Sequence, residues 1–221
     1  MSIQLALGKF NPDHFSHFSK AFSVVEVDLA AYFKWEPREQ KRFRDWILKK
    51  SMGVIPRVSL RTQKSDEEFS DLFVAGMEEF KDHLQFFLIT SGRKSFDLAR
   101  DLRMHRALLH AQKQSLAPLF FEWGEEDDLK TMLPVKDVYP GAGMVLDLDV
   151  HRSSIKKCEG PIHFKLHGWH PERWMRRYGE SLTAKLVKRI PKTGSFVLIL
   201  SHSGRVEEGH SFAKAILDLK G

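Results

Sequence analysis

Short apolar runs alternate along the chain with longer stretches in which apolar residues recur at helical spacing. The apolar runs predict strands at 3–7, 22–27, 53–60, 84–90, 116–122, 143–148, 162–166 and 196–200. The amphipathic stretches predict helices at 12–21, 37–50, 65–81, 96–112, 125–133, 171–190 and 207–219. No repeat, low-complexity tract or linker interrupts this alternation.

Residues with strong local preferences mark several of these elements. Pro12 and Pro37 stand at the first positions of predicted helices, where a missing N–H is tolerated. Ser65, followed three residues later by Glu68, forms a capping box that starts the helix at 65–81. Pro56 lies within the third predicted strand, so we expect it at an edge-like or bulged position of the sheet.

Strict alternation of strand and helix predicts an α/β protein with a parallel sheet. Repeated right-handed crossovers close most naturally into a (β/α)8 TIM-like barrel, with the strand at 196–200 beside the strand at 3–7. An open doubly wound sheet is the alternative, although the first strand-to-helix turn, GKFNPDHF, is not a Gly-rich phosphate loop. Because 221 residues are few for this barrel, we expect a single compact domain over 1–221 with trimmed loops and one missing crossover helix, around 150–161.

Composition narrows the class of protein. The mix of apolar and charged residues is typical of a globular chain, and the single cysteine, Cys158, excludes an intramolecular disulfide and Cys-rich zinc sites. The apolar runs are too short to span a bilayer, and the N-terminus lacks the basic start and small-residue cleavage site of a signal peptide. We therefore expect a cytoplasmic protein that does not bind membranes.

Three stretches near the C-terminus carry a family resemblance: IHFKLHG at 162–168, RYGESLTAKLVKRI at 177–190 and FVLILSHSGRVEEGHSFAKAILDL at 196–219. They resemble the domain-of-unknown-function 72 family, also called YecE-like. Members typically carry an Arg-Leu-His-Gly run on a late strand, a strand ending in paired Asn, and a Gly-x-Ala-x-x-Asn-Ala helix. The first of these motifs corresponds to 165–168 in this sequence, the second to Ser201 and His202, and the third to the segment from Gly209 to Ala215.

The resemblance extends less closely upstream and has clear gaps. Residues 24–28 and Trp46 resemble the family's early Val-Glu-Ile-Asn strand and helix tryptophan, and 119–122 its central Val-Glu-Phe-Arg strand. The family's N-terminal Gly-Thr-Ser-Gly-Trp turn is replaced by 7–10, and the Arg of the central strand by Trp123. The resemblance implies a TIM-like barrel and no established activity.

In such a barrel, functional groups lie at the carboxyl ends of the strands. Glu26, Glu122, Asp147 and His167 are the candidate catalytic residues, since converging carboxylates and a histidine prepare a site for proton transfer or a divalent ion. The alternative is structural: Glu26 pairs with Arg61, and the other two acids cap helices. His163, His167 and His170 lie on a strand and a turn, where their spacing does not bring ligands together, so no metal site is assigned.

The C-terminal third is basic. Residues 1–150 hold 21 basic and 23 acidic residues, a net charge of −2, whereas 151–221 hold 14 and 6, a net charge of +8. TIM barrels often bind phosphate at the loops after strands seven and eight. The candidate anion-binding residues there are Gly168, Ser201, His202, Ser203, Gly204 and Arg205. The alternative is that Ser201–Gly204 is only a polar turn capping the last helix.

Two classes of function follow from these residues. The first is an anion- or phosphate-binding barrel that acts as a hydrolase or lyase on a phosphorylated small molecule or nucleic acid. The second is a degenerate, non-catalytic barrel that binds a ligand or partner, which the replaced family motifs favour. The sequence names no cofactor, substrate or oligomeric state.

Overall fold

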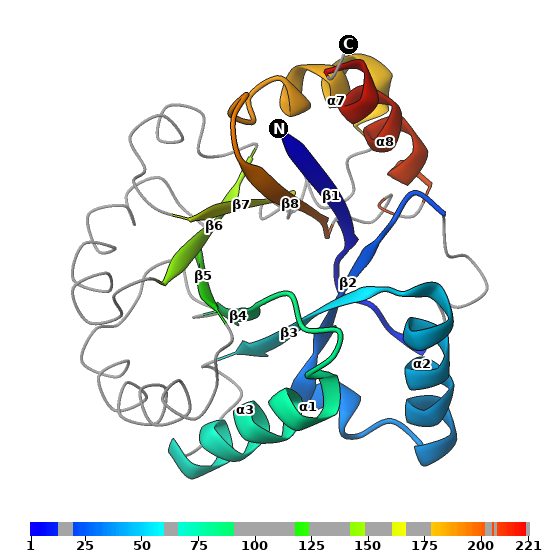
Figure 1. The fold of residues 1–221 in the computed structure, drawn as a ribbon, viewed down its shortest axis with the longest axis vertical. Coiled ribbons are helices and arrows are strands. Elements are labelled where there is room, and N and C mark those ends of the chain that lie inside the picture. The colour runs from blue at the N-terminus through cyan, green and yellow to red at the C-terminus, as the bar shows by residue number, and fades with distance from the viewer. Residues whose placement is uncertain are drawn as a thin grey trace.

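Eight parallel strands close into one barrel in the computed structural model (Figure 1). The structure describes residues 1–12, 20–59, 66–90, 118–123, 142–148, 161–166, 178–201, 205 and 207–219. The strands are β1 (Ser2–Leu7), β2 (Val24–Asp28), β3 (Gly53–Ser59), β4 (Phe87–Thr90), β5 (Leu119–Trp123), β6 (Gly143–Asp147), β7 (Ile162–Leu166) and β8 (Ser195–Leu200). β8 pairs with β1 along the whole of both strands. The (β/α)8 prediction is thus confirmed, and the open-sheet alternative is excluded.

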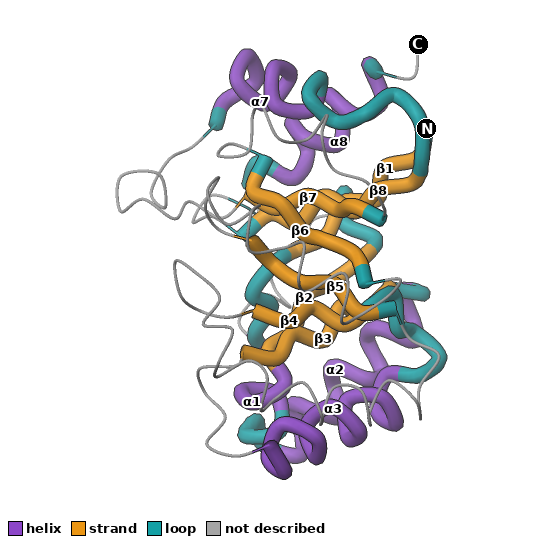
Figure 2. Tube along the Cα trace, turned by 90° about the vertical axis from the view of Figure 1, so that its left-hand side faces the viewer, coloured by secondary structure: helices purple, strands orange, loops and turns teal. Residues whose placement is uncertain are grey.

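Helices cover two sides of this barrel. They are α1 (Leu29–Tyr32), α2 (Pro37–Lys50), α3 (Asp66–Phe80), α7 (Gly179–Val187) and α8 (Gly209–Asp218). Figure 2 shows α7 and α8 beyond one side of the strands and α1, α2 and α3 beyond the opposite side. α2 has the predicted bounds and begins at Pro37, whereas the single-turn α1 was not predicted. No helix in the described ranges has the length and apolar character needed to cross a bilayer.

Several predicted elements lie outside the described residues. They are most of the helix at 12–21, the helices at 96–112 and 125–133, the first part of that at 171–190, the cap residue Ser65, and the region around 150–161 where a crossover helix was expected to be missing.

Side chains of the strands alternate between the inside of the barrel and the helix layer. The inner apolar group consists of Ala6, Val24, Ile55, Phe86, Leu88, Phe120, Val145, Val197 and Ile199. The intervening residues, such as Val25, Leu146 and Phe164, belong to the larger core between barrel and helices. This two-residue period follows from the pleat. At inner positions near their carboxyl ends, β2, β3, β5, β6 and β7 instead carry the polar residues Glu26, Arg57, Glu122, Asp147 and Lys165.

Pro56 lies inside β3, opposite Val27 of β2. On the other side, β3 pairs with the β4 segment at Val54↔Leu84 and again at Arg57↔Leu88. Three steps along β3 therefore match four along its neighbour, which is the extra residue of a β-bulge. The extra residue lies in the neighbouring segment at 84–88, so Pro56 faces the bulge rather than forming it, and the ladder is interrupted where proline lacks its N–H.

An aromatic cluster fixes α2 and the segment after β1 to each other. The ring of Phe43, which is fully buried, lies 5.2 Å from that of Phe10 and 6.1 Å from that of Phe80, between centroids. Phe10 also stacks on Trp46, at 5.2 Å. Phe10 N–H donates to Glu26 O at 2.9 Å. The backbone immediately after β1 is thus held by both packing and hydrogen bonding.

Candidate functional site

A buried lysine joins two of the predicted site residues inside the barrel. Lys165 Nζ lies 2.9 Å from Glu26 Oε2 and 2.9 Å from Glu122 Oε2, although β2, β5 and β7 are far apart in sequence. Lys165 is 1% exposed and Glu26 is 0% exposed. Buried charges are tolerated when they are paired, so the ammonium and the two carboxylates stabilise one another in a space that water does not reach.

Arg57 extends this network toward the end of β2. Its Nη2 donates to Asp28 Oδ2 at 2.7 Å, and its Nε lies 3.5 Å from Glu26 Oε1. Burial acts to lower the pKa of Arg57, but Glu26 and Asp28 outweigh burial and hold this pKa above its ordinary value. Asp28 Oδ1 also accepts from Ala31 N–H at 3.0 Å, so Asp28 caps α1 as well.

Lys9 follows β1 directly and is partly buried beside this network. Its backbone has φ of 52°, a left-handed conformation that residues other than Gly, Asn and Asp seldom adopt. Burial lowers the pKa of Lys9, and the charges of Lys165 and Arg57 lower it further, against the opposing effect of Glu26 and Glu122. Within the described part of the chain, no hydrogen bond or ion pair is made by the Lys9 ammonium. A strained backbone and an ammonium with no direct partner among the described residues thus coincide at Lys9.

The end of β8 lies against the same segment. Arg205 Nε donates to Gly8 O at 3.0 Å, and burial lowers the pKa of Arg205. Ser201 is fully buried, and its Oγ has no hydrogen-bond partner among the described residues. A Cβ at Gly8 would overlap Ser201 Oγ and come within 2.8 Å of Leu200 O, so only glycine permits this approach of β1 to β8. Because the hydrogen bond from Arg205 helps to hold the end of β1 beside β8, Arg205→Ala would disturb the fold as well as any bound anion.

The structure brings some sequence candidates together. Glu26 and Glu122 share Lys165, and the backbone of Asp147, which is buried, pairs with Lys165 in the β6–β7 register. Among the candidates, His167, Gly168, His202, Ser203 and Gly204 lie outside the described residues. Glu26 pairs with Lys165 and Arg57, whereas Arg61, its partner in the structural alternative, lies outside the described residues.

Lys9, Arg57 and Lys165 were missed as site residues. Lys165 and Arg57 each interrupt an apolar strand at an inner position, which is the sequence signal that would have identified them. The sequence gives no comparable signal for Lys9, because the position of this residue depends on the backbone conformation just after β1.

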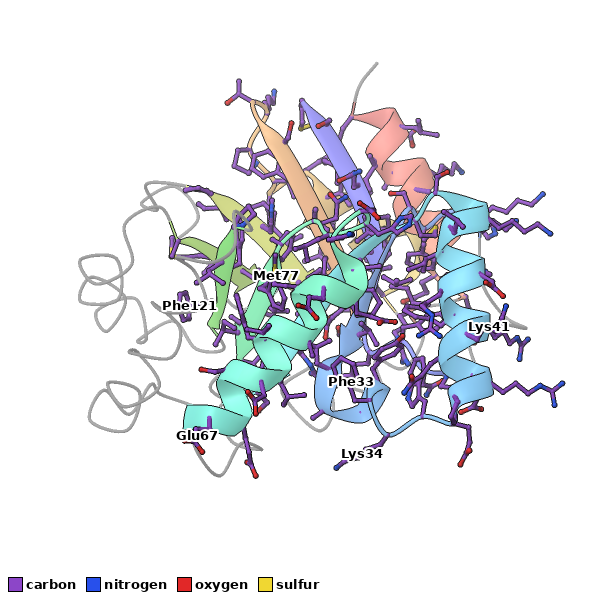
Figure 3. All side chains as sticks on the ribbon, turned by 60° about the horizontal axis from the view of Figure 1, so that its bottom comes forward. Phe33, Lys34, Lys41, Glu67, Met77 and Phe121 are labelled. Atoms are coloured by element: carbon purple, nitrogen blue, oxygen red, sulfur yellow. The ribbon has the colours of Figure 1, made fainter. Side chains whose placement is uncertain are left out.

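An open groove of about 900 Å³ adjoins this network. Lys9, Asp28 and Arg57 line it on the barrel side, and Phe33, Lys34 and Glu68 on the helix side. Figure 3 shows Phe33 and Lys34 at the turn between α1 and α2, with Glu67 near the start of α3. A groove of this size is typical of small-molecule sites. It gives a ligand access to Lys9 and Arg57 but not to the fully buried carboxylate of Glu26.

His163 lies on β7, two residues before Lys165. No group of three His, Cys, Asp or Glu side chains within the described ranges is placed to hold an ion. The His163 ring stacks on Phe120, with centroids 4.3 Å apart, and its Nδ1 accepts from Val197 N–H at 3.3 Å. Burial lowers the pKa of His163 from 6.5 to about 4. The imidazole is therefore neutral and structural near pH 7.

This lowered pKa predicts a pH-dependent stability. The unfolded state binds more protons than the folded state below pH 6.5, so the stability that His163 contributes is complete above that pH and is lost as pH falls toward 4. The loss is about 3 kcal/mol at most. We expect His163→Asn, which keeps an acceptor near Nδ1, to flatten the stability profile between pH 7 and 4.5 in urea titrations. The exposed His210→Asn is the control; equal profiles for all three proteins would contradict the assignment.

Comparisons with known proteins address the fold. No family model matches the chain, and no curated protein matches it. Among solved structures, a DUF72 (domain-of-unknown-function 72) family protein from Enterococcus faecalis V583 is similar with a TM-score of 0.62 and 17% identity, over 98% of this chain and 94% of that one. A DUF72 family protein from Thermotoga maritima is similar with a TM-score of 0.56 and 13% identity over 100% of both chains. The resemblance to this family is thus confirmed at the level of the fold.

The same barrel occurs in enzymes of known activity. A D-psicose 3-epimerase, solved in the presence of D-fructose, is similar with a TM-score of 0.59 and 9% identity, over 97% of each chain. At such identities the likeness shows the fold alone, and functions differ widely among barrels of this kind. A function for this chain has to be argued from its own site.

Proposed function

We propose that the protein binds a small anionic ligand, of the phosphate or carboxylate class, in the groove at the carboxyl end of its barrel. The single observation that carries this proposal is Lys9, which is partly buried on left-handed backbone and makes no ion pair among the described residues. Buried cations are normally compensated. A ligand that supplies negative charge beside Lys9 would provide that compensation.

Neighbouring charges support the same class of ligand. The carboxylate of Asp28 is bound by Arg57, and those of Glu26 and Glu122 share Lys165, so none of these three acids makes a direct ion pair with Lys9. The lowered pKa values of Lys9 and Arg205 have burial as their first cause in both cases. An anion in the groove would offset the free-energy cost of burying the Lys9 ammonium. The size of the groove favours a phosphorylated small molecule over nucleic acid.

We expect Lys9→Met to weaken binding of D-fructose 6-phosphate by about tenfold or more, because a hydrogen bond to a charged group contributes about 1.5–3 kcal/mol. Isothermal titration calorimetry measures the affinity, with D-fructose as the matched ligand that lacks the phosphate and Lys9→Arg as the variant that keeps the charge. Lys41→Met is the control for net charge, since Lys41 is exposed on the outward side of α2 (Figure 3).

The outcomes separate clearly. The proposal is supported if the wild-type protein binds the phosphate ester but not the free sugar. This binding should be lost in Lys9→Met and kept in Lys9→Arg and Lys41→Met. Absence of binding to the wild-type protein, or equal losses in Lys9→Met and Lys41→Met, overturns it.

Turnover of the ligand is a separate expectation. Glu26 and Glu122, the acids proposed from the sequence for proton transfer, are both ion-paired with Lys165. This pairing favours ligand binding over proton transfer by these carboxylates, in line with the non-catalytic alternative. Release of inorganic phosphate from D-fructose 6-phosphate by the wild-type protein, absent in Glu122→Gln, would instead support a hydrolase.

A further inference from the structure

We propose that Lys9 reacts through its ε-amine with the carbonyl group of an aldehyde or ketone in the groove, forming an imine. This inference rests on the proposed function only for the anionic group of the ligand. It names the substrate class as small phosphorylated or carboxylated carbonyl compounds.

The geometry gives Lys9 what a nucleophilic lysine requires. Its side chain lines the open groove, so a small molecule reaches it. Its backbone is held on both sides, since Gly8 N–H donates to Leu200 O at 2.8 Å and Phe10 N–H donates to Glu26 O at 2.9 Å. A non-glycine residue held at φ of 52° is strained, and such strain persists where the surrounding structure enforces it, often at functional sites.

The surrounding charges favour the neutral amine. A lysine becomes nucleophilic near neutral pH when it is desolvated or lies beside another cation. Both conditions hold for Lys9: burial lowers its pKa first, then the charge of Lys165, and Arg57 adds to the effect against Glu26 and Glu122. Lys165 itself is not the nucleophile, because its ammonium lies between two carboxylates and is 1% exposed.

The reaction balances without an oxidant or reductant. The nitrogen lone pair of Lys9 forms a C–N bond to the carbonyl carbon, and the carbonyl oxygen becomes a hydroxyl by taking a proton. Loss of this oxygen as water, with the second amine hydrogen, leaves the C=N bond. A protonated imine carries the same single positive charge as the lysine ammonium, so the attraction for the ligand's anionic group is retained after the bond forms.

Borohydride trapping tests the inference. Wild-type protein is incubated with D-glyceraldehyde 3-phosphate or D-glyceraldehyde, reduced with cyanoborohydride, digested and analysed by mass spectrometry. We expect the adduct on Lys9 to form faster at pH 7 than on the exposed Lys41, since the lowered pKa of Lys9 raises the fraction of its neutral amine. The rate at Lys9 should rise with pH and reach its plateau below the ordinary lysine pKa of 10.5.

The variants separate this inference from the proposed function. Lys9→Arg keeps the charge but has no reactive amine, so it should bind D-fructose 6-phosphate and leave no adduct at position 9. Anion binding without preferential trapping at Lys9 overturns the imine and leaves the proposed function standing. Preferential trapping by both aldehydes alike, without anion binding, upholds the imine and overturns the proposed function. Adducts spread evenly over Lys9, Lys34 and Lys41 also overturn the imine.

Discussion

Lys165→Met is expected to lower the free energy of unfolding by about 3–5 kcal/mol, because removing one member of a buried ion pair leaves the other charge uncompensated. Here two carboxylates lose their cation at once: Glu26, which is 0% exposed, and Glu122, which is 6% exposed. Methionine approximates the volume of the lysine stem, so the loss of stability reflects the uncompensated carboxylates and not a cavity. Urea unfolding at pH 7 measures it.

The control removes the uncompensated charges. In a variant that combines Lys165→Met with Glu26→Gln and Glu122→Gln, neither partner of Lys165 carries a charge, so most of the lost stability should return. A loss below about 1 kcal/mol in Lys165→Met would show that water or other groups solvate these acids and that the network is not closed.

Phe43→Ala is expected to lower the free energy of unfolding by a similar amount, about 3–5 kcal/mol, because it leaves a cavity in a close-packed core. Phe43 is fully buried on α2 and contacts the rings of Phe10 and Trp35, with centroids 5.2 Å and 5.6 Å away. Leu48→Ala is the matched control on the same helix, since Leu48 is 68% exposed and surface changes usually cost less than about 0.5 kcal/mol.

The aromatic cluster also gives this prediction a functional consequence. Phe10 follows Lys9 directly, and its ring lies between Phe43 and Trp46. Loosening that contact should release the strained backbone of Lys9 and weaken anion binding in a variant that still folds. A stability loss in Phe43→Ala no larger than that of Leu48→Ala would contradict the packing described here.

Much of the fold could be predicted because the barrel depends on a pattern that the sequence displays directly. Strands such as β8 bury both faces, so a run such as 196–200 is apolar enough to be recognised, and the bounds of α2 follow from Pro37 and its amphipathic face. α1 was missed because it is a single turn whose start depends on the Asp28 cap. Periodicity does not detect an element of that length.

The site was harder to predict for a physical reason. Glu26 and Glu122 were identified because acids at strand ends are conspicuous in apolar surroundings. Their partner Lys165 comes from a different strand, and only barrel closure places its Nζ between them. Arg57 was missed because Arg61, which follows the predicted strand at 53–60, was considered as the partner of Glu26 instead. Lys9 has a local sequence that shows neither its left-handed backbone nor the cations beside it.

A crystal structure grown with tungstate, a phosphate analogue with strong anomalous scattering, tests whether the groove beside Lys9 binds an anion. We expect an anomalous peak within hydrogen-bond distance of Lys9 Nζ and on the groove side of Arg57. This peak should be displaced by added inorganic phosphate and be absent in Lys9→Met. An empty groove, with tungstate bound instead at surface sites such as the cavity lined by Lys188 and Lys192, would contradict this expectation.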